Sequence, residues 1–258
     1  MAFNLPEYYQ RNSGTIFIAD RDLTTGSYKK SGTGGGLTFI GDASELTFEP
    51  SQEFVEHMEH QTGDGRKDVR IPRSTTLTGN IVLDNTGAAN FRNFMRGKLT
   101  AVTGATVSAE AHTAPAAGQS FLLNSAIVTA VSSITPDPSG TAYVAGTDYV
   151  VDGRTIYLPA ASAMAGDAIL VNYTSGSGSK VDLFGENFKE YYLYFNGFNT
   201  VNRKRVTVEL FKVSFDPASL GNLLGDEIVN MTAGFECLFE PLQASSNLGG
   251  YGNFVMQD

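Results

Sequence analysis

Histidines beside carboxylates are the first residues in this sequence whose types could do chemistry. His57 directly follows Glu56 and His60 directly follows Glu59, and imidazole and carboxylate groups are common metal ligands. A zinc-binding histidine pair on a helix is spaced four residues apart, whereas these two are three apart in a segment of strand or loop character. No third ligand is evident in the sequence, so we expect neither a metal site nor a cofactor here.

Three further patterns fall short of a known chemical motif. The segment 64–68, Asp-Gly-Arg-Lys-Asp, lacks the alternating Asp/Asn ladder and the distal Glu of a calcium loop. The glycine-rich segment 31–36 lacks the Lys-Ser/Thr pair of a phosphate-binding loop, and a flexible hairpin tip is expected instead. Cys237 lies on an alternating strand pattern with no histidine close in sequence, which predicts a buried core thiol. Nothing in the sequence points to an enzyme.

Composition limits the class of protein. A chain of 258 residues, of which 41% are hydrophobic, is long enough for one large domain or two ordinary ones with a sizeable core. A formal net charge of −9 argues against a protein that grips nucleic acid, although it does not exclude one that DNA passes. The single cysteine excludes an intrachain disulfide. We expect a soluble protein without a secretory signal or a membrane span.

Two strand-like arms around a charged segment organise the first half of the chain. They cover 45–55 and 74–84, and in the second Leu77, Ile81 and Leu83 alternate with polar residues, the period of a half-buried strand. The segment between them, 56–73, carries both signs of charge and is predicted to be a long loop, a feature that compact domains seldom keep unless the loop has a function or is disordered.

This charged segment is the predicted subunit interface. Val55, just before the segment, and Met58, Val69 and Ile71 within it are apolar and suit strand extensions or contacts with a partner. We therefore expect the segment to contact a neighbouring subunit. The predicted interface residues are Glu56, His57, Glu59, His60, Asp64, Arg66, Lys67, Asp68, Arg70 and Arg73.

One helix is expected, over 86–97. Phe91, Phe94 and Met95 fall on one face, which predicts packing against a sheet. Asn85 or Thr86 is expected to cap its start, and Gly97 to end it.

The second half again shows strand patterns. They cover 191–195 and 203–215, separated by a turn expected at Asn196-Gly197, and the parity of the apolar residues in the second strand switches, which predicts a bulge near Leu210. A further strand is expected over 228–239, and the glycine- and serine-rich end, 242–258, is predicted to be an arm.

Between about residues 100 and 180 charge almost vanishes, and short strand-like runs alternate with turns. This change predicts an inserted β-sandwich over 101–179, bounded by flexible linkers at Thr103-Gly104 and 175–179. The expected strands are 119–123, 126–134, 142–144, 148–151, 155–158 and 168–173. The remaining parts, 1–100 and 180–258, would form one discontinuous domain, and the fold class is therefore mainly β with one short helix.

The order of these parts resembles that of the major tail tube proteins of long, non-contractile-tailed bacteriophages, or siphophages. The resemblance covers most of the chain, and the insert is similar to the immunoglobulin-like modules that some of these proteins carry. The segments that carry it are 15–20 (Thr-Ile-Phe-Ile-Ala-Asp), 39–48, 76–84, 191–195 and 205–213, with 146–152 and 171–173 in the insert.

The resemblance implies a β-sandwich or barrel-forming domain that assembles as hexameric rings. Such rings stack around a tape-measure protein, meet tail terminator and tail-tip proteins, and later conduct double-stranded DNA without binding it specifically. The protein would be made in the bacterial host cytoplasm and reside in the virion tail, away from any membrane. If each of six subunits gave four strands, about 24 would line the lumen, more than the roughly 16 to 18 that leave an aqueous channel.

A second class of function stays open from the sequence. The protein could be a monomeric or low-order binding module, in which the inserted sandwich recognises a cell-surface glycan or protein. An enzyme is the third and most distant class.

Overall fold

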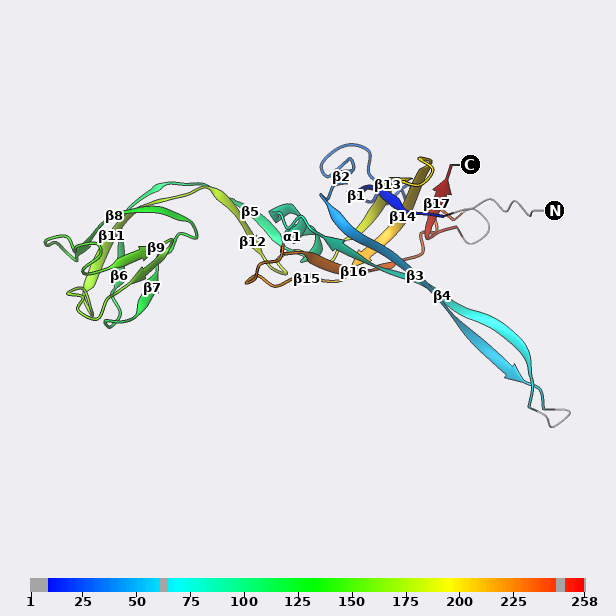
Figure 1. The fold of residues 1–258 in the computed structure, drawn as a ribbon, viewed down its shortest axis with the longest axis horizontal. Coiled ribbons are helices and arrows are strands. Elements are labelled where there is room, and N and C mark those ends of the chain that lie inside the picture. The colour runs from blue at the N-terminus through cyan, green and yellow to red at the C-terminus, as the bar shows by residue number, and fades with distance from the viewer. Residues whose placement is uncertain (1–8, 61–64, 245–248, 258) are drawn as a thin grey trace. The chain divides into compact units, whose positions relative to one another are not determined.

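The structure is a computed structural model that describes residues 9–60, 65–244 and 249–257 (Figure 1). The described part is mainly β, with one short helix and antiparallel sheets, which confirms the predicted fold class. The chain divides into two compact units, Met1–Lys98 with Leu183–Asp258, and Leu99–Asp182. No helix among the described residues is long and apolar enough to cross a membrane.

The first unit is built on one nine-stranded sheet. The strand order is β2-β1-β13-β14-β16-β4-β3, with β15 paired to β16 and β17 paired to β14. The strands are β1 (Asn12–Asp20), β2 (Thr38–Phe39), β3 (Ala43–Met58), β4 (Lys67–Leu83), β13 (Glu190–Asn199), β14 (Arg205–Phe215), β15 (Ser219–Leu220), β16 (Met231–Cys237) and β17 (Gly252–Met256).

A β-bulge in β14 shapes this sheet. Tyr191 of β13 pairs with Val213, whereas Leu193 pairs with Leu210, so β14 contains one extra residue between them. This confirms the bulge predicted near Leu210. On its other edge, β14 pairs with β17 through Val206–Leu210 and with β16 through 213–215. The bulge therefore lets one strand hold three neighbours and turns Phe211 to the opposite face, where it packs with Tyr192.

Strands that lie far apart in the sheet share one hydrophobic core. Ile18 of β1 and Ile81 of β4 are both buried in it, so the sheet curls until its two sides face each other. Cys237 is buried in the same core, as predicted, and burial raises the pKa of its thiol to about 12. The buried members are Ile16, Ile18, Ile40, Ile81, Leu83, Phe94, Leu193, Val208, Leu210, Val213, Phe215, Met231, Ala233, Phe235 and Cys237.

Helix α1 (Ala88–Phe94) covers part of this core. Phe94 is buried with its ring 4.8 Å from that of Phe215, Phe91 is partly buried against the core, and Met95 is buried. The predicted cap is wrong: the N-cap is Gly87, without a side-chain hydrogen bond. Asn85 instead accepts a hydrogen bond from the Gly87 amide before the helix begins.

The predicted loop over 56–73 is wrong. Strands β3 and β4 continue through most of it as an antiparallel hairpin, paired as far as Met58 and Lys67. The physical reason is the β-branched residues Val55, Val69 and Ile71, which favour an extended, pleated backbone even where they remain exposed.

The predicted turn at Asn196-Gly197 is also wrong, because both residues lie inside β13. Gly197 pairs with Gly14 of β1, and the Phe195 ring lies over this pair of glycines. A Cβ atom on Gly197 would lie 2.4 Å from Cζ of Phe195, so the glycine makes room for an aromatic ring and does not make a turn.

The predicted C-terminal arm is partly wrong. Gly252–Met256 forms β17, whose Phe254 pairs with Val208 of β14. The Tyr251 hydroxyl donates a hydrogen bond to the Thr75 carbonyl at 2.9 Å. The glycine-rich composition of this segment does not suggest a strand. Glycine is nevertheless needed at position 252, because a Cβ there would lie 2.2 Å from the Glu209 carbonyl oxygen.

The second unit contains two three-stranded sheets around its own core. One has the order β6-β11-β8 and the other β7-β10-β9, and Ile156 of β10 and Val171 of β11 are buried in the shared core. The strands are β6 (Thr106–Thr113), β7 (Ser120–Leu122), β8 (Val128–Pro136), β9 (Val150–Asp152), β10 (Thr155–Tyr157) and β11 (Ala168–Ser175).

Two predictions for this unit are wrong. No strand forms over 142–144; Tyr143 there donates a hydrogen bond through its hydroxyl to Asp167 at 2.7 Å. The second segment expected to be a flexible linker, 175–179, ends within a strand. Its last two residues belong to β12 (Gly178–Asp182), which pairs with β5 (Lys98–Val102). Serine hydroxyls accept hydrogen bonds there, Ser175 from the Ala105 amide and Ser177 from the Gly104 amide.

We predict that the first unit folds without the second. The Phe184 amide donates to the Met95 carbonyl at 3.3 Å, so the two chain ends left by removing the second unit lie close together. Joining Lys98 to Leu183 through a short Gly/Ser link should give a soluble protein, because loop-closure entropy changes slowly with length. Hydrogen exchange should show the amides of β14 and β16 protected as in the whole chain. Insoluble product, or loss of that protection, would show that the units depend on each other.

Candidate functional site

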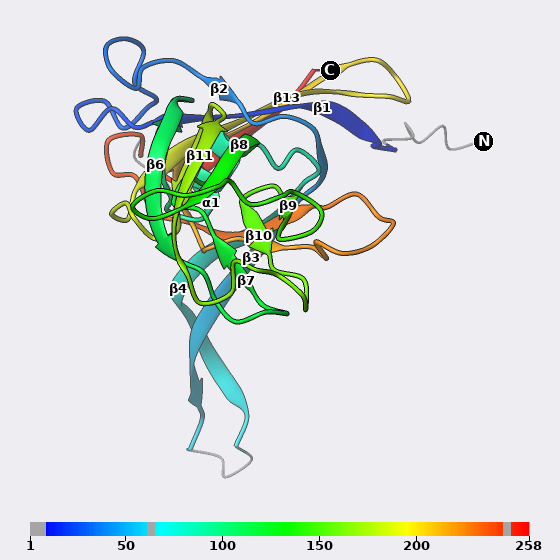
Figure 2. The same ribbon diagram turned by 90° about the vertical axis from the view of Figure 1, so that its left-hand side faces the viewer.

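Strands β3 and β4 extend past the sheet as a two-stranded arm (Figure 2). β16 pairs with β4 only from Leu77 to Leu83, whereas β3 stays paired with β4 as far as Met58 and Lys67. We call 50–58 and 67–76 the arm. Almost every side chain on it is exposed, with only Phe54 partly buried. An isolated two-stranded hairpin is only marginally stable in water, so the presence of this arm requires an explanation.

One face of the arm is apolar and open. Val55 pairs with Ile71, and His57 with Val69, and residues paired across antiparallel strands point to the same face. Val55, Val69 and Ile71 therefore lie together, with 54%, 44% and 58% of their surfaces exposed. Three exposed aliphatic side chains thus form one apolar group on this face of the arm.

The opposite face of the arm is charged. Glu56 pairs directly with Arg70, and its carboxylate contacts the Lys67 ammonium and lies 3.7 Å from the Arg70 Nε. The hydrogen bond from Lys67 lowers the pKa of Glu56. The Arg70 guanidinium lies 3.5 Å from the centroid of the Phe54 ring. These contacts align the side chains along the ribbon but, being exposed, contribute little to stability.

His57 on the arm and His60 beside its end both contact other side chains. His57 Nδ1 lies 2.7 Å from Asp68 Oδ1, and this hydrogen bond lowers the pKa of the Asp68 carboxyl. The His57 and His60 rings meet edge to face with centroids 6.0 Å apart. Within the described ranges, no group of three or more His, Cys, Asp or Glu side chains is placed to hold a metal ion.

The structure brings most of the predicted interface residues together on this hairpin. Glu56, His57, Lys67, Asp68 and Arg70 make the contacts described above. Four further members, placed on the arm or beside its end, are Glu59, His60, Arg66 and Arg73. Asp64 lies outside the described residues.

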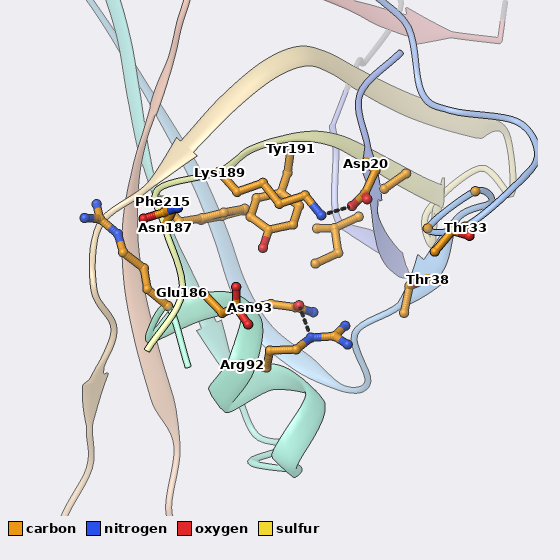
Figure 3. A pocket seen from close by; sticks show the side chains of 15 residues that line it. Asp20, Thr33, Thr38, Arg92, Asn93, Glu186, Asn187, Lys189, Tyr191 and Phe215 are labelled. Atoms are coloured by element: carbon orange, nitrogen blue, oxygen red, sulfur yellow. Dashed lines mark hydrogen bonds and ion pairs between the residues drawn. The ribbon is translucent and has the colours of Figure 1, made fainter. Parts of the chain in front are cut away.

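A cleft of about 410 Å³ lies elsewhere in the first unit, among β1, the glycine-rich loop, α1 and the start of β13 (Figure 3). Lys189 reaches Asp20 at 2.5 Å on one side, and Arg92 on the helix donates to Asn93 at 3.1 Å. Burial, followed by the charge of Asp20, raises the pKa of Tyr191. The residues that line the cleft include no His, Cys or Ser, so the cleft offers no nucleophile paired with an imidazole base.

The glycine-rich loop beside this cleft is held in place. The Gly36 amide donates to the Lys29 carbonyl, and Lys29 Nζ donates to the Thr33 carbonyl at 2.7 Å. Gly34 has a φ of +77°, and a Cβ there would lie 2.4 Å from Asp20 Oδ2. The flexible hairpin tip expected from the sequence is therefore a closed loop that packs on the end of β1.

A buried ion-pair network ties the first unit together, and sequence reasoning missed it. The Arg21 guanidinium contacts the carboxylates of both Glu190 and Glu240, and Lys212 Nζ lies 3.3 Å from Glu190. Only 7% of the Arg21 side chain and 4% of the Glu240 side chain are exposed. These partners are 169 and 219 residues from Arg21, so no local pattern could reveal them.

The second unit holds its own polar cluster, around Glu110. Its carboxylate accepts hydrogen bonds from the Tyr173 hydroxyl at 2.5 Å and the Asn124 amide at 3.0 Å, and lies 2.6 Å from His112 Nε2. Burial acts to raise the pKa of Glu110, but these hydrogen bonds outweigh it and the pKa is lowered. The cluster joins β6, β11 and the chain after β7, which is a structural role.

Comparison with known proteins identifies a family but no function. The sequence model of a family described as "Protein of unknown function UCP028589" matches residues 9–255. No match is found among curated proteins.

We predict that the Glu110 cluster makes the second unit sensitive to acid. Because the pKa of Glu110 is lowered on folding, its contribution to stability is present above the ordinary carboxyl pKa and is lost as the pH falls through the folded value. Glu110→Gln should lower the free energy of unfolding by about 1–3 kcal/mol at neutral pH, and much less in acid. Asp152→Asn, an exposed carboxylate on β9, is the matched control. A gap between Glu110→Gln and wild type that stays constant from neutral to acid pH, measured by thermal melts, would contradict this assignment.

Proposed function

The chain belongs to the family described as protein of unknown function UCP028589, and we propose that it is a structural virion protein of a long, non-contractile-tailed bacteriophage. In this proposal it polymerises as stacked hexameric rings into the tail tube, the conduit for DNA delivered to the host. The resemblance in the order of the sequence parts supports this proposal.

The observation that carries the proposal is the arm. A two-stranded ribbon with Val55, Val69 and Ile71 exposed on one face has no core of its own. Such a ribbon gains stability only by burying that face, and every copy of the chain carries the same ribbon. If each arm packs on a neighbouring subunit in a repeating assembly, the apolar face of every arm is buried in the same way.

The charge of the chain suits a conduit. A protein with a net charge of −9 repels the phosphates of a passing duplex more than it attracts them, so DNA would not adhere. We propose that the rings stack around a tape-measure protein, end at tail terminator and tail-tip proteins, and make no specific contact with DNA. The protein would be made in the host cytoplasm and reside in the virion tail, with no enzymatic activity.

One observation favours the second candidate function, a binding module for a surface glycan or protein. On the sheet β7-β10-β9, Tyr157 pairs with Val150, so these two residues share a face with Leu122 two positions along on β7. All three side chains are exposed. An exposed tyrosine among aliphatic side chains can stack on a sugar ring or another protein. This module could also serve a tail tube, so the two functions can coexist in one chain.

We predict that removing the apolar groups of the arm blocks assembly without unfolding the subunit. Val55→Ser with Ile71→Ser should shift the protein from large species to monomer in analytical ultracentrifugation, because burial of each side chain contributes about 1.5–3 kcal/mol. The melting temperature of the monomer should change little, since neither residue contacts the core.

The matched control lies on the same arm. Gln52→Ser with Thr75→Ser removes a polar cross-strand pair, whose side chains are 3.1 Å apart, and should leave assembly intact. If the apolar variant assembles as readily as this control, the arm is not the assembly surface. If both variants and the wild type remain monomeric at every concentration, the tail tube proposal falls.

A further inference from the structure

We infer that the two edges of the β3–β4 hairpin are matched by charge, so that the β3 edge of one copy lies beside the β4 edge of the next copy. The occupant of each edge is thus a second copy of this chain. This inference rests on the proposed self-assembly, and it names which surfaces meet.

Both edges of the hairpin are open. β3 is the last strand of its sheet, and over 67–76 β4 has no neighbouring strand other than β3. In that stretch the Tyr251 hydroxyl occupies the carbonyl of Thr75. The outward N–H and C=O groups of an edge strand are a template for pairing with another strand. The arm therefore offers two such templates, one on each side.

The two strands carry opposite charge. Between residues 49 and 59, the charged side chains other than histidine are all acidic: Glu49, Glu53, Glu56 and Glu59. Between residues 66 and 76, four of the five charged side chains are basic: Arg66, Lys67, Arg70 and Arg73, against Asp68. The formal charges of these side chains sum to −4 in the first stretch and to +3 in the second. One edge of the hairpin is thus negative and the other positive.

The contact between Glu56 and its basic partners inside the ribbon shows how these strands match. Glu56 pairs with Arg70 and contacts Lys67 across the strands. Opposite charges directly across antiparallel strands are favourable, and like charges are unfavourable. A β3 edge beside a β4 edge repeats this match between copies, whereas β3 beside β3 or β4 beside β4 would oppose like charges.

The charge pattern therefore selects a head-to-tail contact. Copies related by rotation about an axis along the arm run in the same direction, so β3 of one copy and β4 of the next are antiparallel, as they are inside each ribbon. A contact between two different surfaces is heterologous and closes into a ring when the rotation divides the circle. A two-fold dimer of arms would instead join like edges.

The test is a charge-swap complementation. The acidic-edge variant carries Glu49→Lys, Glu53→Lys and Glu59→Lys, and the basic-edge variant carries Arg66→Glu, Lys67→Glu and Arg73→Glu, so that Glu56 and Arg70, which pair within the ribbon, are kept. Each variant alone then presents two edges of the same net sign and should lose about tenfold or more in the assembled fraction. The equal mixture should recover to within about twofold of wild type, because each altered edge then meets its complement in a ring with an even number of subunits.

Two further measurements keep the result interpretable. A variant with all six substitutions restores edges of opposite net charge within one chain and should assemble alone. Thermal melts of each monomer should match wild type, because all six side chains lie outside the core of the first unit. Recovery on mixing cannot come from contacts within a chain, because each chain in the mixture keeps its altered edge.

The outcomes separate this inference from the proposed function. If wild type forms tubes but the mixture assembles no better than either variant, the edges do not recognise each other and the tail tube proposal stands. The same conclusion follows if each variant alone assembles like wild type. If the mixture recovers but the particles are not rings or tubes, the edge pairing stands and the proposed function falls. If wild type does not associate at all, both fall.

Discussion

The arm depends on how unequally β4 is held along its length. From Leu77 to Leu83 this strand is paired on both sides, and Ile81 and Leu83 are fully buried, whereas from 67 to 76 it is paired on one side only and exposed. The buried half fixes the direction of the exposed half. A ribbon that could not hold its shape alone is thus presented as the extension of a rigid sheet.

The neighbours of β14 likewise change along its length. One bulge lets the strand meet β16 and β17 on the same edge, which curls the sheet around a single core. The Arg21 network then joins β1, β13 and the segment after β16 from outside that core. Together these contacts join segments of the first unit that lie far apart in the sequence.

Sequence patterns predicted the features that depend on neighbouring residues. The alternation in β4 and β16, the bulge near Leu210, the buried Cys237 and the apolar helix face follow from the period of the hydrophobic residues. Features set by distant partners were missed or wrong. One is the strand through Asn196-Gly197, where a ring covers a glycine pair, and another is β17, whose paired residues on β14 lie 42 to 50 positions earlier in the chain. The charged segment 56–73 was predicted to be a loop because exposed, charged residues favour one. The β-branched residues within and beside it favour a strand, and this preference determined the structure.

The central claim is that this chain assembles into rings through its arm. Negative-stain electron microscopy of the purified whole chain over a range of concentrations tests it most directly. The account predicts six-fold rings with an open centre that stack into tubes as concentration rises. Compact single particles at every concentration, and also in the presence of tail terminator and tail-tip proteins, would contradict it.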